Sequence, residues 1–87
     1  MPSKPLKYAA FNISAATTAL VKGILALYPD AHIVPRVTPL EDEDISMEVA
    51  LPLRMEEIYA ARERIHELVM QLQEHYDVLI LASAIPA

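Results

Sequence analysis

One stretch decides the fold of this chain: residues 45–82, ISMEVALPLRMEEIYAARERIHELVMQLQEHYDVLILA. Residues 45–51 alternate between apolar and polar side chains, which is typical of a strand with one buried face. Residues 55–76 place apolar side chains at helical spacing, opposite a row of glutamates. Residues 78–82 are apolar throughout, as in a strand that is covered on both faces. The stretch therefore predicts a strand, a helix and a second strand in succession.

The N-terminal half predicts the same succession. Residues 7–13 alternate with period two and are interpreted as a strand. Residues 14–28 follow as a helix, with Ser14 as a suitable N-cap and a proline directly after the last residue. Residues 32–38 form the next predicted strand. Pro35 and Pro39 cannot donate to a neighbouring strand, so this strand is expected at an edge of the sheet.

Together these elements predict a ferredoxin-like βαββαβ fold of the α+β class. In that arrangement a four-stranded antiparallel sheet, with strand order 4-1-3-2, carries two helices on one face. Residues 1–87 form a single domain, in which residues 1–6 are a loose lead-in. Gly23 falls on the apolar face of the first helix, which predicts a close approach of that helix to the sheet.

The apolar content predicts a partner. Apolar residues make up 54% of the 87 positions, which is much for a domain with so small an interior. In the predicted order the last strand is an edge strand, although both of its faces are apolar. We therefore expect a homo-oligomer, or another protein partner that covers this surface. The interface candidates are Tyr59, Met70, Leu79 and Leu81.

Charge and residue usage disfavour several classes of function. The net charge of −5 opposes nucleic-acid binding, because the phosphates would be repelled. The chain has no cysteine, which suits a cytoplasmic protein and removes thiolate chemistry. No apolar run approaches the roughly 20 residues that span a bilayer, so no membrane partner is expected. A single glycine leaves no glycine-rich nucleotide loop, and no cofactor is predicted.

The acidic and histidine residues do not predict a metal site. The acidic run at residues 41–44 lacks the spaced ligands of a calcium loop and is interpreted as a solvated turn. Glu63 and His66 stand at helical spacing, but they supply only one half of the carboxylate–histidine pattern found in di-iron bundles. His75 lies more than two helical turns from His66 and does not complete the set.

The role predicted on these grounds is a small non-enzymatic, oligomeric interaction or regulatory module that binds a small ligand at a subunit interface. The ligand-binding candidates are Tyr8, His32, Arg36 and His66. One alternative is a small enzyme whose active site forms between the subunits of a dimeric ferredoxin-like barrel. Another is a subunit of a larger protein complex. No catalytic residue is identified by the sequence.

Overall fold

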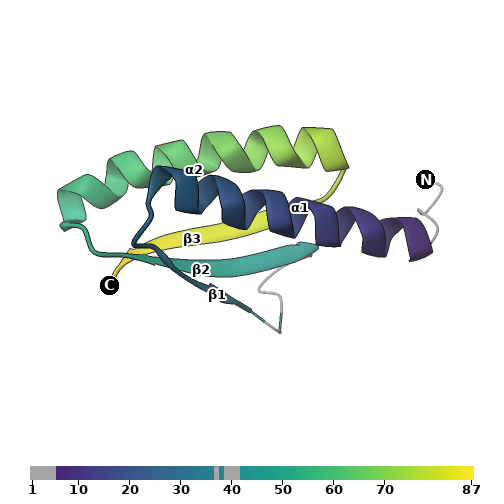
Figure 1. The fold of residues 1–87 in the computed structure, drawn as a ribbon, viewed down its shortest axis with the longest axis horizontal. Coiled ribbons are helices and arrows are strands. Elements are labelled where there is room, and N and C mark those ends of the chain that lie inside the picture. The colour runs from purple at the N-terminus through teal and green to yellow at the C-terminus, as the bar shows by residue number, and fades with distance from the viewer. Residues whose placement is uncertain (1–5, 37, 39–41) are drawn as a thin grey trace.

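The computed structural model describes residues 6–36, 38 and 42–87, with the backbone alone for residues 6–10. Its elements, in chain order, are α1 (Leu6–Leu27), β1 (His32–Pro35), β2 (Ile45–Leu51), α2 (Met55–Tyr76) and β3 (Ile80–Pro86). The strands form one sheet of order β1-β2-β3, and both helices lie on the same side of it (Figure 1). The molecule is thus a two-layer α+β structure.

The prediction of a four-stranded antiparallel sheet with order 4-1-3-2 is wrong. Residues 7–13, expected as the first strand, belong to the beginning of α1. β1 and β2 are antiparallel, but β2 and β3 are parallel and lie side by side, with Ile45 opposite Ile80. Because no strand lies between β2 and β3, the two ends of the β2–α2–β3 unit pair directly. The sheet is therefore three-stranded and mixed.

The reason for the helix lies in a spacing of four residues that continues through the segment. Asn12, Ala16, Leu20 and Ile24 are all buried on one stripe of α1. Residues four positions apart lie on the same face of a helix, so one helix buries all four side chains together. A strand over residues 7–13 would bury only alternate residues of that short segment. Alanine, the best helix former, occupies two of those seven positions. Among the described residues, no helix is long and apolar enough to cross a membrane.

Several other predictions are confirmed. β2 and α2 have the predicted bounds of residues 45–51 and 55–76. The first turn of α2 is closed by a bond from the Arg54 N–H to Glu57 Oε1, at 3.1 Å. β1 is an edge strand as expected, although it ends at Pro35. Arg36 and Thr38, which the prediction included, are not part of the strand, and Val37 and the flanking Pro39 lie outside the described residues, as do residues 1–5 of the expected lead-in.

The last strand also differs from its predicted bounds. β3 begins two residues later than expected and continues to Pro86, so that it spans seven residues. It is an edge strand, as predicted, but its neighbour is β2 rather than the strand expected from residues 7–13.

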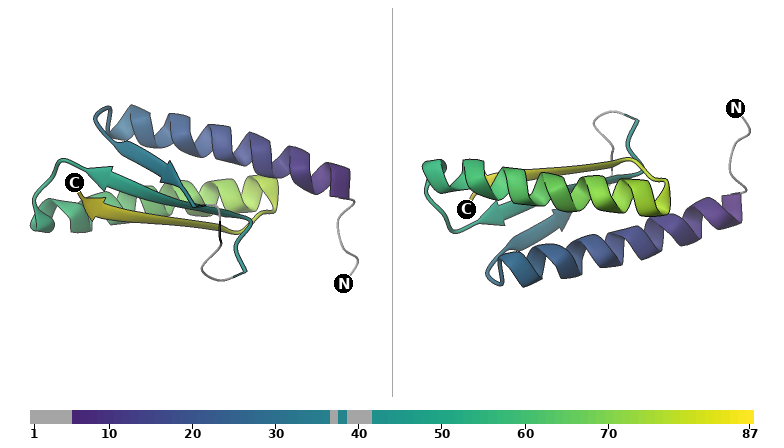
Figure 2. Two further views of the ribbon diagram at one scale, coloured as in Figure 1. Left: turned by 90° about the horizontal axis from the view of Figure 1, so that it is seen from below. Right: turned by 90° about the horizontal axis from the view of Figure 1, so that it is seen from above.

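The core lies between the helices and the sheet. Its largest fully buried side chains are Leu20, Ile24, Met47, Leu51, Ile58, Ile65 and Val49. The helices themselves meet at Gly23, where an added Cβ would lie 2.6 Å from Leu68 Cδ2 of α2. The close approach predicted at Gly23 is therefore between two helices, not between a helix and the sheet. The opposite face of the sheet is covered by neither helix (Figure 2).

Candidate functional site

The outer edge of β3 is the most distinctive surface of the molecule. β2 is its only neighbouring strand among the described residues. Along a strand, the backbone groups of successive residues point to opposite edges. Leu79 O accepts a bond from Ile45 N at 3.0 Å, and Ala87 N donates to Leu51 O at 2.8 Å, so odd-numbered residues face β2. The residues whose backbone groups point outward are Ile80, Ala82 and Ala84.

Two side chains of α2 cap the two ends of this edge. Arg62 Nε donates to Ala84 O at 3.0 Å. The Ile80 N–H donates to Gln73 Oε1 at 2.8 Å. Both bonds reach the strand from outside the sheet, which agrees with the alternation. Between the two caps, the N–H and C=O of Ala82 have no partner within the described part of the chain.

A groove runs between this edge and α2. It has a volume of about 590 Å³ and is lined by residues 80–85 of β3 together with Arg62, Glu63, His66 and Val69 of α2. Above it lies a stripe of side chains three or four residues apart, which share one face of α2. We call this stripe the α2 rim: Tyr59, Arg62, His66, Met70 and Gln73.

The α2 rim exposes apolar surface to solvent. Tyr59 is 61% exposed and Met70 is 50% exposed. The guanidinium of Arg62 lies over the Tyr59 ring, 5.6 Å from its centroid, which is within the range of a cation–π contact. Arg62 therefore contacts Tyr59 of the rim and Ala84 of the strand edge, so the rim and the edge form one continuous surface.

The four predicted interface residues are divided between the α2 rim and the start of β3, and the side chain of Leu81, opposite Ser46, lies on the uncovered face of the sheet. Tyr59 and Met70 belong to the α2 rim. Leu79 directly precedes β3 and is 56% exposed, and Leu81 is a half-buried residue of β3 itself. Tyr59 and Met70 therefore lie in the helix layer, whereas the Leu81 side chain lies on the other face of the sheet. Their role as an interface stays a prediction.

The other edge of the sheet is constructed differently. Arg36 N donates to Ser46 O at 2.8 Å, so even-numbered residues of β1 face β2, and Pro35 faces outward. Proline has no N–H, so this short edge lacks a donor at the position where a further strand would bind. Pro35 thus blocks the last position of the four-residue β1, whereas β3 reaches its outward-facing proline, Pro86, only after six residues, 80–85, that include no proline or charge.

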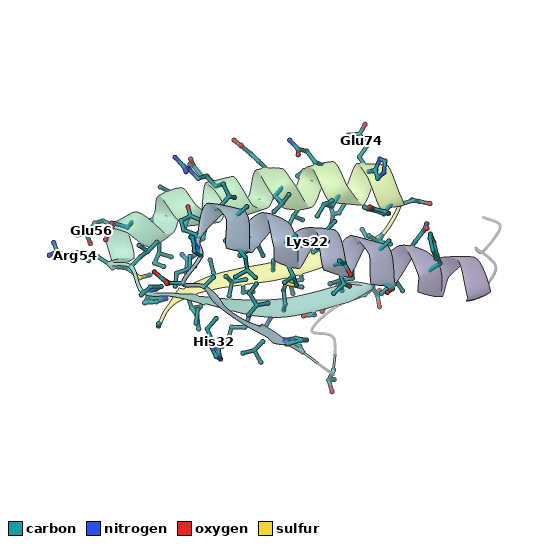
Figure 3. All side chains as sticks on the ribbon, viewed as in Figure 1. Lys22, His32, Arg54, Glu56 and Glu74 are labelled. Carbon is teal, nitrogen blue, oxygen red and sulfur yellow. The ribbon has the colours of Figure 1, made fainter. Side chains whose placement is uncertain are left out.

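The uncovered face of the sheet carries a second group of polar residues. Arg36 Nη2 lies 3.4 Å from Glu48 Oε2 in a partly exposed ion pair, and such pairs contribute about 1 kcal/mol or less. His32 projects from the same side of the sheet, away from the helices (Figure 3). Ser46 is buried on this face, and its Oγ has no hydrogen-bond partner among the described residues.

The four ligand-binding candidates do not form one cleft within a single copy. His32 and Arg36 share the uncovered face of the sheet. His66 lines the groove beside α2, in the helix layer, so the sheet separates it from the other two. Tyr8 lies in α1 rather than on a strand as expected, and its side chain is outside the described residues.

The acidic turn has a structural contact. Asp44 Oδ2 accepts a bond from the Leu79 N–H at 2.9 Å and so connects the start of β2 to the start of β3. Glu41, at the other end of the acidic run, lies outside the described residues. In the described ranges, no three histidine or carboxylate side chains are grouped closely enough to hold a metal ion.

Sequence reasoning missed the residues that define the β3 edge. Arg62 and Gln73 stand at rim spacing, but nothing in their spacing shows that they bond to a strand. Ala82 has no side-chain signature at all, since its importance comes from its backbone and from the absence of a neighbouring strand on that side in the described structure.

Comparison with known proteins adds no relative: no family model matches the chain, and neither the curated proteins nor the solved structures give a match. Functional inference therefore rests on the geometry of the chain itself.

Proposed function

We propose that this protein is a non-enzymatic interaction module that associates with itself through its β3 side. The contact surface consists of the outer edge of β3, the groove beside it and the α2 rim. The observation that carries the proposal is the unpaired backbone of Ala82, the third residue of a seven-residue edge strand without charge between residues 80 and 85.

Such an edge favours association for two reasons. Unpaired N–H and C=O groups offer a template for another strand, and proteins that stay monomeric commonly protect such edges with charges, prolines or covering elements. β1 has this protection through Pro35, but β3 does not between residues 80 and 85. The exposed Tyr59 and Met70 lie beside the β3 edge, and aromatic and methionine side chains are enriched at protein interfaces.

Light scattering after size exclusion tests the proposal. The wild-type chain of 9.7 kDa should elute as a dimer or larger species at concentrations from about 1 μM to about 1 mM. A rim variant, Tyr59→Lys with Met70→Lys, places two charges on the contact surface and should shift the mass towards the monomer. A wild-type chain that stays monomeric throughout would overturn the proposal.

A matched control separates a specific surface from general solubility. Phe11 and Leu25 of α1 are 70% and 39% exposed, so Phe11→Lys with Leu25→Lys makes an equal charge change on exposed apolar residues elsewhere. This α1 variant should associate as the wild type does. If the α1 variant became monomeric while the rim variant did not, the contact surface would be α1 and the proposal would be wrong.

A further inference from the structure

We infer that two copies of the chain join their β3 strands edge to edge, antiparallel, about a two-fold axis at Ala82, and so form one continuous six-stranded sheet. This inference rests on the proposed function and specifies how the surface is used. The strand that pairs with the outer edge of β3 is thus β3 of a second copy.

The free backbone groups of the edge are arranged symmetrically about Ala82. Arg62 and Gln73 each occupy one outward backbone group. The outward groups left without a hydrogen-bond partner in the described structure are the Ile80 C=O, the N–H and C=O of Ala82, and the Ala84 N–H. An antiparallel pair centred on Ala82 sets Ala82 opposite the partner's Ala82 and Ile80 opposite the partner's Ala84. In this register, each free donor meets a free acceptor.

The two caps are complementary to each other as well. Arg62 is a donor that occupies the Ala84 C=O, and Gln73 Oε1 is an acceptor that occupies the Ile80 N–H. In the paired strands the Ile80 N–H bonds to the C=O of the partner's Ala84, which releases both caps at the same place. The Gln73 side chain then faces the partner's Arg62, so a donor and an acceptor meet again and no polar group is left unpaired.

The α2 rim fits the same axis. Arg62 lies over Ala84 and Gln73 lies over Ile80, so the residues between them on the rim, His66 and Met70, lie nearest to the axis at Ala82. The two-fold operation therefore brings the half-exposed Met70 towards the rim of the partner. This self-complementarity, with each patch contacting its own copy, is what an isologous dimer requires.

Amide hydrogen exchange of the wild-type protein tests the register directly. In the dimer, the amides of Ala82 and Ala84 should exchange at least about 100-fold more slowly than in the monomeric rim variant. The amides of Leu81 and Ser83 face β2 and should be protected in both states, so they serve as controls within the same strand. An Ala82 amide that exchanges equally fast in both states would overturn the inference.

A substitution at Ala82 gives an independent test. Ala82→Pro removes the central N–H and places a ring on the edge, while the bonds to β2 come from the neighbouring residues. We expect its dimer dissociation constant to rise at least about 100-fold. Ala82→Ser is the matched control, since it keeps the N–H, and it should dimerise as the wild type does. Equal dissociation constants for the folded Pro and Ser variants would contradict the inference, and if the Pro variant does not fold, exchange at Ala82 decides.

The outcomes separate this inference from the proposed function. A dimer that the rim variant dissociates, but whose Ala82 amide is unprotected, would leave the β3 side as the contact surface and refute strand pairing. A wild-type chain that is monomeric at every concentration would overturn both.

Discussion

Asn12 is a buried polar residue of α1 that bonds to the end of α2. It is 7% exposed, and its Nδ2 donates to Tyr76 O at 2.9 Å, across 64 positions of sequence. Tyr76 is the last residue of α2, where backbone carbonyls lack partners within the helix. Asn12 thus satisfies the end of α2 from within α1, which it can do only because residues 7–13 are helical.

We predict that Asn12→Ala lowers the free energy of unfolding by about 1–3 kcal/mol, because a partly buried carbonyl loses its donor. Asn12→Asp should cost more than Asn12→Ala, since a carboxylate cannot donate and is repelled by the negative end of α2. Urea denaturation measures both values. The exposed Ser14→Ala serves as a control, with a change of about 0.5 kcal/mol or less. An Asn12→Ala variant as stable as the wild type would contradict a stabilising role of the bond from Asn12 to Tyr76 O.

At the scale of elements, the junction between α2 and β3 directs the strand to its edge position. Asp77 ends the helix in the left-handed conformation, with φ 53° and ψ 50°. This conformation turns the chain so that β3 begins after a link of three residues, 77–79, and runs parallel to β2. The bond from Leu79 N–H to Asp44 Oδ2 then holds the start of β3 beside the start of β2.

The conformation of Asp77 predicts an order of stability for its variants. Asparagine tolerates the left-handed region, and glycine adopts it without steric cost, whereas a β-branched residue is strained there. Asp77→Val should therefore be less stable than Asp77→Asn by about 1–3 kcal/mol, and Asp77→Gly should match or exceed Asp77→Asn. Because glycine and valine both lack a polar side-chain group, comparing the denaturation midpoints of these two variants reports the backbone effect. A valine variant as stable as the asparagine variant would contradict this.

On the scale of the whole molecule, the two edges of the sheet differ in how open their backbone is to a further strand. β1 has only four residues and ends in Pro35, whereas β3 presents an open backbone over residues 80–85, beneath the α2 rim, before it ends in Pro86. A molecule with one protected and one open edge forms a closed pair rather than an extending sheet, because pairing of the open edges leaves only protected ones. The proposed dimer would therefore have β1 at both ends of its sheet.

Association of this kind makes stability depend on protein concentration. Since the dimer is part of the native state, the Tm of the wild type should rise by roughly 5 °C or more between about 1 μM and about 100 μM. The Tyr59→Lys, Met70→Lys variant should have a Tm that does not change over the same range. Thermal unfolding followed by circular dichroism measures both, and a constant wild-type Tm would argue against a dimer in this range.

Sequence patterns predicted the helix of residues 55–76 and the strand of residues 45–51 with their bounds, because each has a long and unambiguous period. The pattern failed at residues 7–13, where a short alternation competes with the helical spacing of Asn12 and Ala16. The interface residues were predicted from their apolar character; Tyr59 and Met70 share the α2 rim, but the Leu81 side chain lies on the uncovered face of the sheet, because the side-chain direction of a strand residue depends on its register. Arg62, Gln73 and Ala82 were not predicted as edge residues, since their contacts depend on which strand lies beside β3.

The sequence by itself determined the elements of residues 45–51 and 55–76 and the apolar faces that they bury, because propensity, periodicity and proline positions act within a few residues along the chain. The tertiary structure alone decided that β2 pairs with β3 in parallel, that Asn12 completes the end of α2, and that the open edge belongs to β3. These choices join residues from 35 to 64 positions apart, and their energies come from burial and hydrogen bonds that exist only after the chain has closed on itself.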